Sequence, residues 1–255
     1  KLMKIDRVIF ASNGNKNYLE FWPTVSKAWK SFGVTPTLIY ADANDDGVNY
    51  DCGEVVKIPK IDSLNSAFIA QNSRLLAPAL FGDEVCIISD IDNMPISKGY
   101  YFNPIKDLEN DKFVIYRPNV CASNQISIMW NAALGSTWGE IFKIKSLNDI
   151  INTLRYWYPA NYKPFKGEGH ADSTWFTDQV LLHKYVQYFK NENENRIFEL
   201  NDNESGFYRL DRLCDDSKHS TSFDLNGNYS DFHMPRPYSQ HKAAVDEVYN
   251  FYFKK

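Results

Sequence analysis

Two aspartates one residue apart follow an apolar segment of strand length. Residues 85–88 read Val-Cys-Ile-Ile, and Asp90 and Asp92 come just after them. Side chains two positions apart in an extended chain lie on the same face, so both carboxylates can be directed at one point. Such a pair is costly to hold together without a cation, and hard divalent cations prefer oxygen ligands. The pattern therefore favours a cation-binding pair, although a strand followed by a polar turn fits the tripeptide equally well.

The elements around this pair alternate between strand and helix over the first ninety residues. Apolar periodicity predicts helices at 17–32 and 64–81, and strands at 7–11, 37–41, 54–58 and directly before Asp90. This alternation predicts an α/β fold with a Rossmann-like, mostly parallel central sheet flanked by helices. Open sheets of this kind bind ligands beyond the carboxyl ends of their strands, which is where Asp90 and Asp92 fall.

The rest of the chain is predicted to add shorter elements to the same domain. The patterns predict strands at 112–116 and 125–130, helices near 136–145, 147–157, 175–190 and 243–253, a long loop at 158–174 and an irregular segment at 215–238. Loops as long as 158–174 are often functional in compact domains. Repeats and breaks in composition are absent from the sequence, so we expect one domain over residues 1–255.

Composition argues against several classes of protein. The formal net charge is −4 with basic residues scattered among acidic ones, whereas a duplex nucleic-acid binder would carry a basic stripe. The four cysteines are widely spaced and form no Cys-x-x-Cys, so we expect neither a disulfide framework nor a zinc site, and a cytoplasmic location is the default. No apolar run approaches the roughly 18–20 residues of a membrane span.

Small polar residues end the first predicted strand, and a carboxylate ends the second. Ala11, Ser12 and Asn13 follow one strand and Asp42 the other, so all four should share a sheet edge with Asp90. Backbone and small polar groups suit a nucleotide base, and a carboxylate suits its edge or the ribose. A role as turn formers explains the same residues. The sequence has no glycine-rich dinucleotide motif and no P-loop.

Two helical segments carry further candidates. Arg74 falls on the helix before Asp90, where its planar guanidinium could bind a diphosphate or sugar oxygen, or could simply face solvent. Asp178 and Gln179 fall in the first turn of a later helix, where the helix dipole favours a carboxylate. Alternatively, they lie at a pocket rim and bind a sugar hydroxyl or accept a proton.

A late turn rich in proline contains an imidazole and a cation three residues apart. His233 and Arg236 belong to the segment His-Met-Pro-Arg-Pro. If this turn folds back onto the aspartate pair, His233 completes an oxygen-rich site with one nitrogen, and Arg236 meets phosphate. That ligand set suits Mn²⁺ as well as or better than Mg²⁺. A histidine in a polar turn can also be merely exposed.

Together these segments resemble the GT-A glycosyltransferases, especially the family that includes glycogenin and bacterial galactosyltransferases. The best match joins residues 72–81 (Asn-Ser-Arg-Leu-Leu-Ala-Pro-Ala-Leu-Phe) to residues 89–92 (Ser-Asp-Ile-Asp). It resembles that family's arginine-bearing helix, short turn and strand ending in an Asp-x-Asp motif. The resemblance implies a single GT-A domain, with its nucleotide-binding part at about 1–120 and its acceptor side and metal-ligand turn at about 121–255.

The resemblance also implies roles for the candidate residues. Asp90, Asp92 and His233 would ligate Mn²⁺ on the diphosphate, and the donor-binding and catalytic groups would include Arg74, Ile91, Asp178, Gln179 and Arg236. The implied reaction moves a hexose, glucose or galactose, from a UDP-sugar to a carbohydrate or other hydroxyl acceptor, with retention of configuration. If configuration is instead inverted, a carboxylate base is needed, with Asp178 as first candidate and Asp172 as second.

Two other classes of protein remain as alternatives. A phosphatase of the haloacid dehalogenase type also places Asp-x-Asp after an apolar strand, but near the N-terminus and with a downstream Gly-Asp-x-x-x-Asp, which this sequence lacks. A non-catalytic carbohydrate-binding protein could stack a sugar on the aromatic residues 156–158, and such a protein has no need for UDP.

Overall fold

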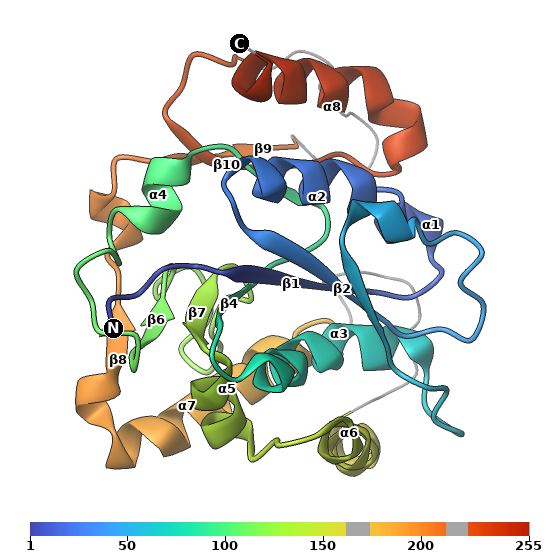
Figure 1. Cartoon of the computed structure of the whole chain (residues 1–255), viewed down its shortest axis with the longest axis vertical. Coiled ribbons are helices and arrows are strands. Elements are labelled where there is room, and N and C mark those ends of the chain that lie inside the picture. The colour runs from blue at the N-terminus through green and yellow to red at the C-terminus, as the bar shows by residue number, and fades with distance from the viewer. Residues whose placement is uncertain (162–173, 213–223, 255) are drawn as a thin grey trace.

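A seven-stranded sheet forms the centre of the computed structural model, which describes residues 1–161, 174–212 and 224–254 (Figure 1). The strand order is β3-β2-β1-β4-β7-β6-β8, with bounds, in that order, of Glu54–Lys57, Thr35–Tyr40, Arg7–Ser12, Val85–Ile88, Asn131–Leu134, Phe113–Ile115 and Ile197–Glu199. Among the described strands of this sheet, β7 pairs antiparallel with both β4 and β6, and the other pairings are parallel. The predicted α/β fold with a mostly parallel sheet is confirmed.

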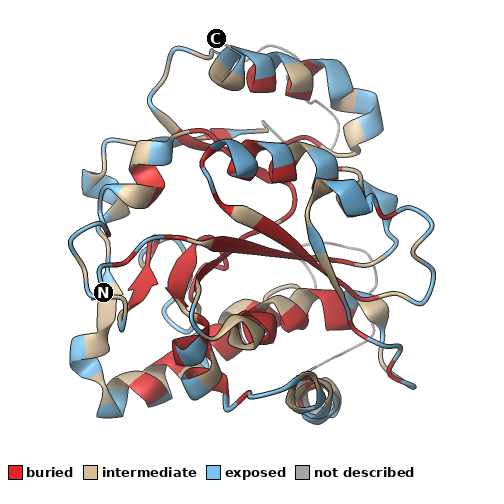
Figure 2. Cartoon of the chain, in the orientation of Figure 1, coloured by how far each residue is buried: buried red, intermediate tan, exposed pale blue. Residues whose placement is uncertain are grey.

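Helices cover both faces of this sheet (Figure 1). One face is covered by α3 (Ser66–Leu76), α5 (Gly135–Phe142), α6 (Leu147–Asn161) and α7 (Thr177–Glu192), and the other by α2 (Trp22–Ser31) and, beyond it, α8 (Tyr238–Phe253). In β1, Val8 and Phe10 pack with the α2 side while Ile9 packs with the α3 side. The strand is therefore buried on both faces (Figure 2), which is why it reads as an unbroken apolar run.

A smaller three-stranded sheet joins the chain after the aspartate pair to a segment near the C-terminus. Its order is β5-β10-β9, with bounds Asn93–Pro95, Tyr229–His233 and Tyr208–Asp211. The central strand β10 is antiparallel to β5, with His233 opposite Asn93, and parallel to β9, with His233 opposite Asp211. The register thus sets three distant parts of the sequence side by side next to Asp92.

Prolines explain two differences from the predicted helices. The helix predicted at 17–32 is divided into α1 (Lys16–Leu19) and α2, and Pro23 occupies the first turn of α2. Proline is favoured there because the first turn leaves its N–H groups unpaired anyway. The helix predicted at 64–81 ends as α3 at Leu76 and continues as the 3₁₀ turn Ala77–Phe81, with a proline near its start.

The strand predicted at 125–130 is wrong. All four of its apolar side chains are buried, but the strand in this region is β7, which begins at Asn131. The Asn131 side chain donates to the Ser127 carbonyl at 2.7 Å, and the Ile126 N–H donates to the Gln179 carbonyl at 3.2 Å. These contacts provide hydrogen-bond partners in an irregular buried segment. The apolar residues indicate burial here, but they do not indicate a strand.

The segment predicted to be irregular at 215–238 contains β10, and residues 215–223 lie outside the described chain. The sequence of β10 is polar, yet the strand is largely buried. Asp231 is completely buried and pairs with Arg117 at 2.8 Å and with Arg209 at 3.0 Å. A buried charge is tolerated when it is paired in this way. The terminal helix begins at Tyr238 rather than at residue 243.

Several short elements complete the described chain. They are α4 (Lys98–Phe102) and the 3₁₀ turns Tyr50–Cys52, Glu194–Arg196 and Asp202–Glu204. Of the loop predicted at 158–174, residues 158–161 belong to α6 and residues 162–173, with Asp172, lie outside the described chain. Among the described helices, none combines the length and the apolar character needed to cross a bilayer.

Candidate functional site

The aspartate pair lies in the turn between β4 and β5, at the carboxyl edge of the parallel strands. The Ser89 N–H still donates to the Ile9 carbonyl, so the sheet ladder extends one residue past β4. The Asp90 side chain is 32% exposed and the Asp92 side chain 8% exposed. The two carboxylates therefore differ: one is accessible from solvent, while the other is enclosed by side chains from elsewhere in the chain.

Arg74 on α3 connects Asp90 to the beginning of α7. Its Nη1 donates to Asp90 Oδ1, and its Nη2 donates to Asp178 Oδ2 at 2.5 Å. Burial alone lowers the pKa of Arg74, but the two carboxylates more than offset this and raise it. The solvent-facing alternative for this arginine is thus excluded, because it is the buried bridge between two candidate carboxylates.

Asp178 and Gln179 occupy the first turn of α7 (Thr177–Glu192), as the sequence indicates. Asp178 is only 1% exposed, so its carboxylate does not lie at a pocket rim. Burial raises the pKa of Asp178, and Arg74 counteracts part of that rise. Gln179 accepts a hydrogen bond from the Cys121 thiol at 3.1 Å.

His233, at the end of β10, lies against Asp92. Its Nε2 is 3.5 Å from Asp92 Oδ2, and its Nδ1 is 3.0 Å from Asp211 Oδ1. Burial lowers the pKa of His233, but its hydrogen bonds to Asp211 and Asp92 outweigh burial and raise it. The turn folds back onto the aspartate pair, because the Met234 N–H also donates to the Asp92 carbonyl at 2.9 Å.

Two arginines complete the surroundings of Asp92. Arg236 Nε is 3.6 Å from Asp92 Oδ2, and its guanidinium lies 4.9 Å from the centre of the Tyr18 ring while Nη1 donates to the Tyr18 hydroxyl. Arg212 Nη1 is 3.0 Å from the same Asp92 oxygen. Burial raises the pKa of Asp92, but hydrogen bonding to His233 and the charges of both arginines outweigh it and lower the pKa far below its usual range.

Sequence reasoning missed Asp211 and Arg212. They lie at the end of β9, a four-residue strand with no clear alternation. Their relation to the site depends on the β9–β10 register, which places Asp211 opposite His233. Nothing in the local sequence around Asp211 and Arg212 indicates which residues they contact. Only a prediction that β9 pairs with β10 would have identified them.

The candidate nucleotide residues gather at the ends of β1 and β2. The Ala41 N–H donates to the Ser12 carbonyl at 2.9 Å, so the pairing of β1 with β2 continues one residue past the end of β2. Ala11, within β1, lies opposite Ile39 of β2. The Asn13 side chain donates to Ser66 Oγ at 3.1 Å, and the Gly14 N–H donates to Asp42 Oδ2 at 3.3 Å. Ile91, between the two aspartates, is buried. The shared edge is as predicted, while the nucleotide-binding role of these residues stays a prediction.

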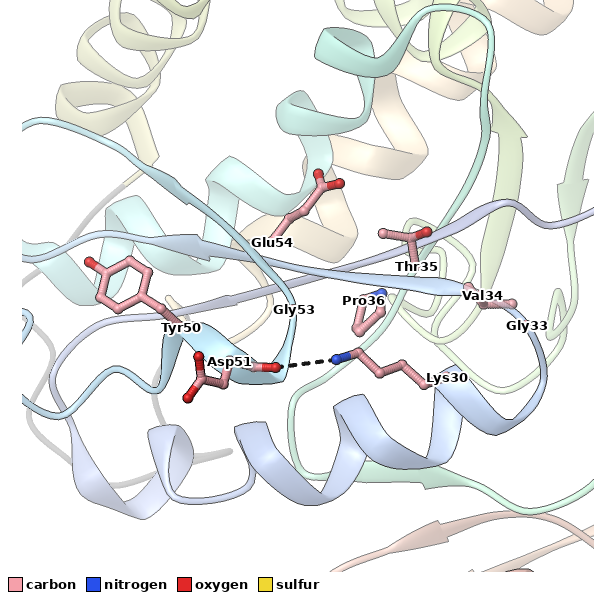
Figure 3. A pocket seen from close by; sticks show the side chains of 9 residues that line it. All are labelled: Lys30, Gly33, Val34, Thr35, Pro36, Tyr50, Asp51, Gly53 and Glu54. Atoms are coloured by element: carbon pink, nitrogen blue, oxygen red, sulfur yellow. Dashed lines mark hydrogen bonds between the residues drawn. The ribbon is translucent and has the colours of Figure 1, made fainter.

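A hollow of about 390 Å³ lies away from these residues (Figure 3). It is lined by Lys30, Gly33, Val34, Thr35, Pro36, Tyr50, Asp51, Gly53 and Glu54. These surround the beginnings of β2 and β3, so the hollow opens at the edge of the sheet opposite the aspartate pair. None of the candidate site residues lines it.

The donor atoms fit a divalent cation in type, but their carboxylates are engaged. Asp90 and Asp92 offer oxygens and His233 offers a nitrogen, the mixed set that suits Mn²⁺. Asp90 is bonded to Arg74, and Asp92 to Arg212. In the part of the chain that the structure describes, no three His, Cys, Asp or Glu side chains converge closely enough to ligate one ion.

Comparison with known proteins found similarity only among solved structures. No protein-family model and no curated protein sequence matches the chain. The glycosyltransferase GlyE of Streptococcus pneumoniae, in its apo form, is 12% identical with a TM-score of 0.49 over 98% of this chain and 64% of GlyE. The galactosyltransferase LgtC, in complex with donor and acceptor sugar analogues, is 10% identical with a TM-score of 0.48 over 94% of this chain and 95% of LgtC. In a further GlyE structure the chain covers 46% of the protein, less than half its length.

Proposed function

We propose that this protein is a metal-dependent glycosyltransferase that moves a hexose, glucose or galactose, from a UDP-sugar to a carbohydrate or other hydroxyl acceptor with retention of configuration. One observation carries the proposal: His233 and Arg236 lie within 3.6 Å of Asp92 at the carboxyl edge of the sheet. The Asp-x-Asp turn and the late histidine turn thus belong to one site, located where α/β sheets bind ligands.

Asp90, Asp92 and His233 would hold the cation after moving closer together than they lie in this structure. Asp211 binds Nδ1 of His233, which leaves Nε2 facing Asp92. Ligating histidines commonly donate their other ring N–H to a carboxylate, and this orients the ring. When bound, a divalent cation would supply charge neutralisation for the departing diphosphate.

The chain's own cations and carboxylates have complementary tasks. Arg236, stacked on Tyr18, would bind a phosphate oxygen through its permanently charged, forked guanidinium. Arg74 donates to Asp90 and, through its other nitrogen, to Asp178 in the first turn of α7, so it would orient Asp90 for the donor. With retention, the leaving phosphate can accept the acceptor's proton, so the buried Asp178 need not serve as a strong base.

The test is calorimetric titration of UDP into the protein with Mn²⁺ and again with excess EDTA. We expect micromolar binding with Mn²⁺ that disappears in EDTA and in Asp92→Asn, followed by hexose transfer from one member of a UDP-sugar panel. Asp83→Asn, which alters an exposed carboxylate ahead of β4, should bind UDP normally. Absence of UDP binding in every condition would overturn the UDP-dependent function. GDP would then be tried, and hydrolysis of an aryl phosphate with Mg²⁺ would favour the phosphatase.

A further inference from the structure

Arg212 occupies one carboxylate oxygen of Asp92, which is a proposed ligand of the cation. Its Nη1 donates to Asp92 Oδ2 at 3.0 Å and to the Met234 carbonyl at 3.1 Å. The Arg212 side chain is 11% exposed and that of Asp92 8% exposed, so water has little access to the contact. Charge-assisted hydrogen bonds of this kind are about twice as strong as neutral ones.

The same oxygen faces the other proposed ligand. His233 Nε2 is 3.5 Å from Asp92 Oδ2, so a cation shared by Asp92 and His233 would lie beside that oxygen. Two positive centres, the guanidinium and a divalent ion, would then face one carboxylate oxygen at short range and repel each other. Through Oδ2, Asp92 can therefore neutralise Arg212 or ligate the ion, but it gains little from doing both.

We propose that Arg212 is an internal competitor for the divalent cation, holding Asp92 in the free protein and releasing it when the cation binds. This inference rests on the proposed metal-dependent function and assigns Arg212 a part in it. Once released, the guanidinium needs a new anionic partner, and the diphosphate of the nucleotide is the one that the proposed function supplies. Mn²⁺ and UDP consequently bind with positive coupling, and each strengthens the other by the same factor.

The first experiment titrates Mn²⁺ alone into the wild-type protein, Arg212→Gln and Arg236→Gln, without nucleotide. Freeing Asp92 from one charge-assisted hydrogen bond should tighten Mn²⁺ binding by about tenfold in Arg212→Gln. Arg236→Gln removes the same charge near the same oxygen, but from 3.6 Å and from a guanidinium that is bonded to Tyr18. It should give a clearly smaller gain. Equal gains in both variants, or no gain in Arg212→Gln, would overturn the competition.

The second experiment compares thermal unfolding in EDTA and in Mn²⁺. In EDTA, Arg212→Gln should have a lower melting temperature than wild type. Addition of Mn²⁺ should raise its melting temperature by more than it raises that of wild type. The matched control is Arg209→Gln in β9, the strand that ends just before Arg212, because Arg209 also lies 3.0 Å from a buried aspartate, Asp231, outside the aspartate pair. Arg209→Gln should have a lower melting temperature in EDTA, but Mn²⁺ should raise its melting temperature no more than it raises that of wild type. If Arg212→Gln does not fold, Arg212→Lys should bind Mn²⁺ more tightly than wild type by a smaller factor.

Failure of this inference and failure of the proposed function are distinguishable. Mn²⁺-dependent UDP binding by wild type, together with unchanged Mn²⁺ affinity in Arg212→Gln, would overturn the role of Arg212 and leave the nucleotide site intact. The loss of coupling between Mn²⁺ and UDP in Arg212→Gln would support it. If no variant binds Mn²⁺ or UDP, both proposals are wrong.

Discussion

Arg74 and Asp178 form a buried ion pair across 104 residues of sequence, with 2.5 Å between Nη2 and Oδ2. The other terminal nitrogen of Arg74 donates to Asp90. One guanidinium therefore ties α3, the turn after β4 and the first turn of α7 into a single unit. This unit sets the positions of two carboxylates that the sequence identifies separately.

Removal of Arg74 should be strongly destabilising. Arg74→Ala leaves the Asp178 carboxylate buried without its partner, which should lower the free energy of unfolding by roughly 3–5 kcal/mol in urea denaturation. Arg155→Ala, on the exposed side of α6, is the control and should change little. The double variant Arg74→Ala/Asp178→Ala should recover part of the loss. A double variant as unstable as Arg74→Ala would show that the unpaired charge is not the cause.

The stability that His233 contributes should depend on pH. The pKa of His233 is raised above the ordinary 6.5, so its contribution is fully present below that pH and is lost as pH rises through the folded-state pKa. In EDTA, His233→Gln should therefore lower the melting temperature more at about pH 5.5 than at about pH 8.5. Asp211→Asn should weaken this pH dependence, because one of the hydrogen bonds that raise the pKa is lost. Equal effects of His233→Gln at both pH values would contradict the prediction.

The Tyr18 hydroxyl should matter for nucleotide affinity. Tyr18→Phe keeps the ring under Arg236 and removes the acceptor that orients its guanidinium. We expect UDP affinity in Mn²⁺ to fall by about three- to tenfold, the effect of losing roughly 1 kcal/mol of hydrogen bonding. Tyr50→Phe, at the hollow on the opposite edge of the sheet, should leave UDP affinity unchanged. If both variants bind UDP like wild type, Tyr18 does not position Arg236.

Gly135 should tolerate no larger residue. A Cβ at the start of α5 would lie 2.5 Å from the Phe81 carbonyl oxygen and 2.6 Å from that of Pro78, and neither backbone atom can move aside cheaply. Gly135→Ala should lower the free energy of unfolding by about 1–3 kcal/mol. Gly82→Ala is the matched control, because nothing lies within 4 Å of the Cβ it would add. Equal stability of the two variants would show that the 3₁₀ turn at 77–81 relaxes around the added methyl group.

Local sequence patterns are sufficient to predict the strands at the centre of the fold. Strands such as β1 and β4 are buried on both faces, so their apolar runs are a local signal that does not depend on knowing a partner. Alternation with helices then implies a parallel sheet, and Asp90 and Asp92 necessarily fall beyond the carboxyl end of a strand. The predicted fold class followed from these local patterns alone.

The contacts between charged side chains, in contrast, depend on strand pairing and helix packing. Strands β5, β9 and β10 have three to five residues each and are rich in polar residues, some of them buried in β5 and β10, so their sequences resemble turns until the pairing is known. That pairing brings Arg212 and His233 to Asp92, and the packing of α7 against α3 buries Asp178 on Arg74. A charge is stable in such surroundings only beside a partner. Because these partners are far apart in the chain, no local pattern could reveal them.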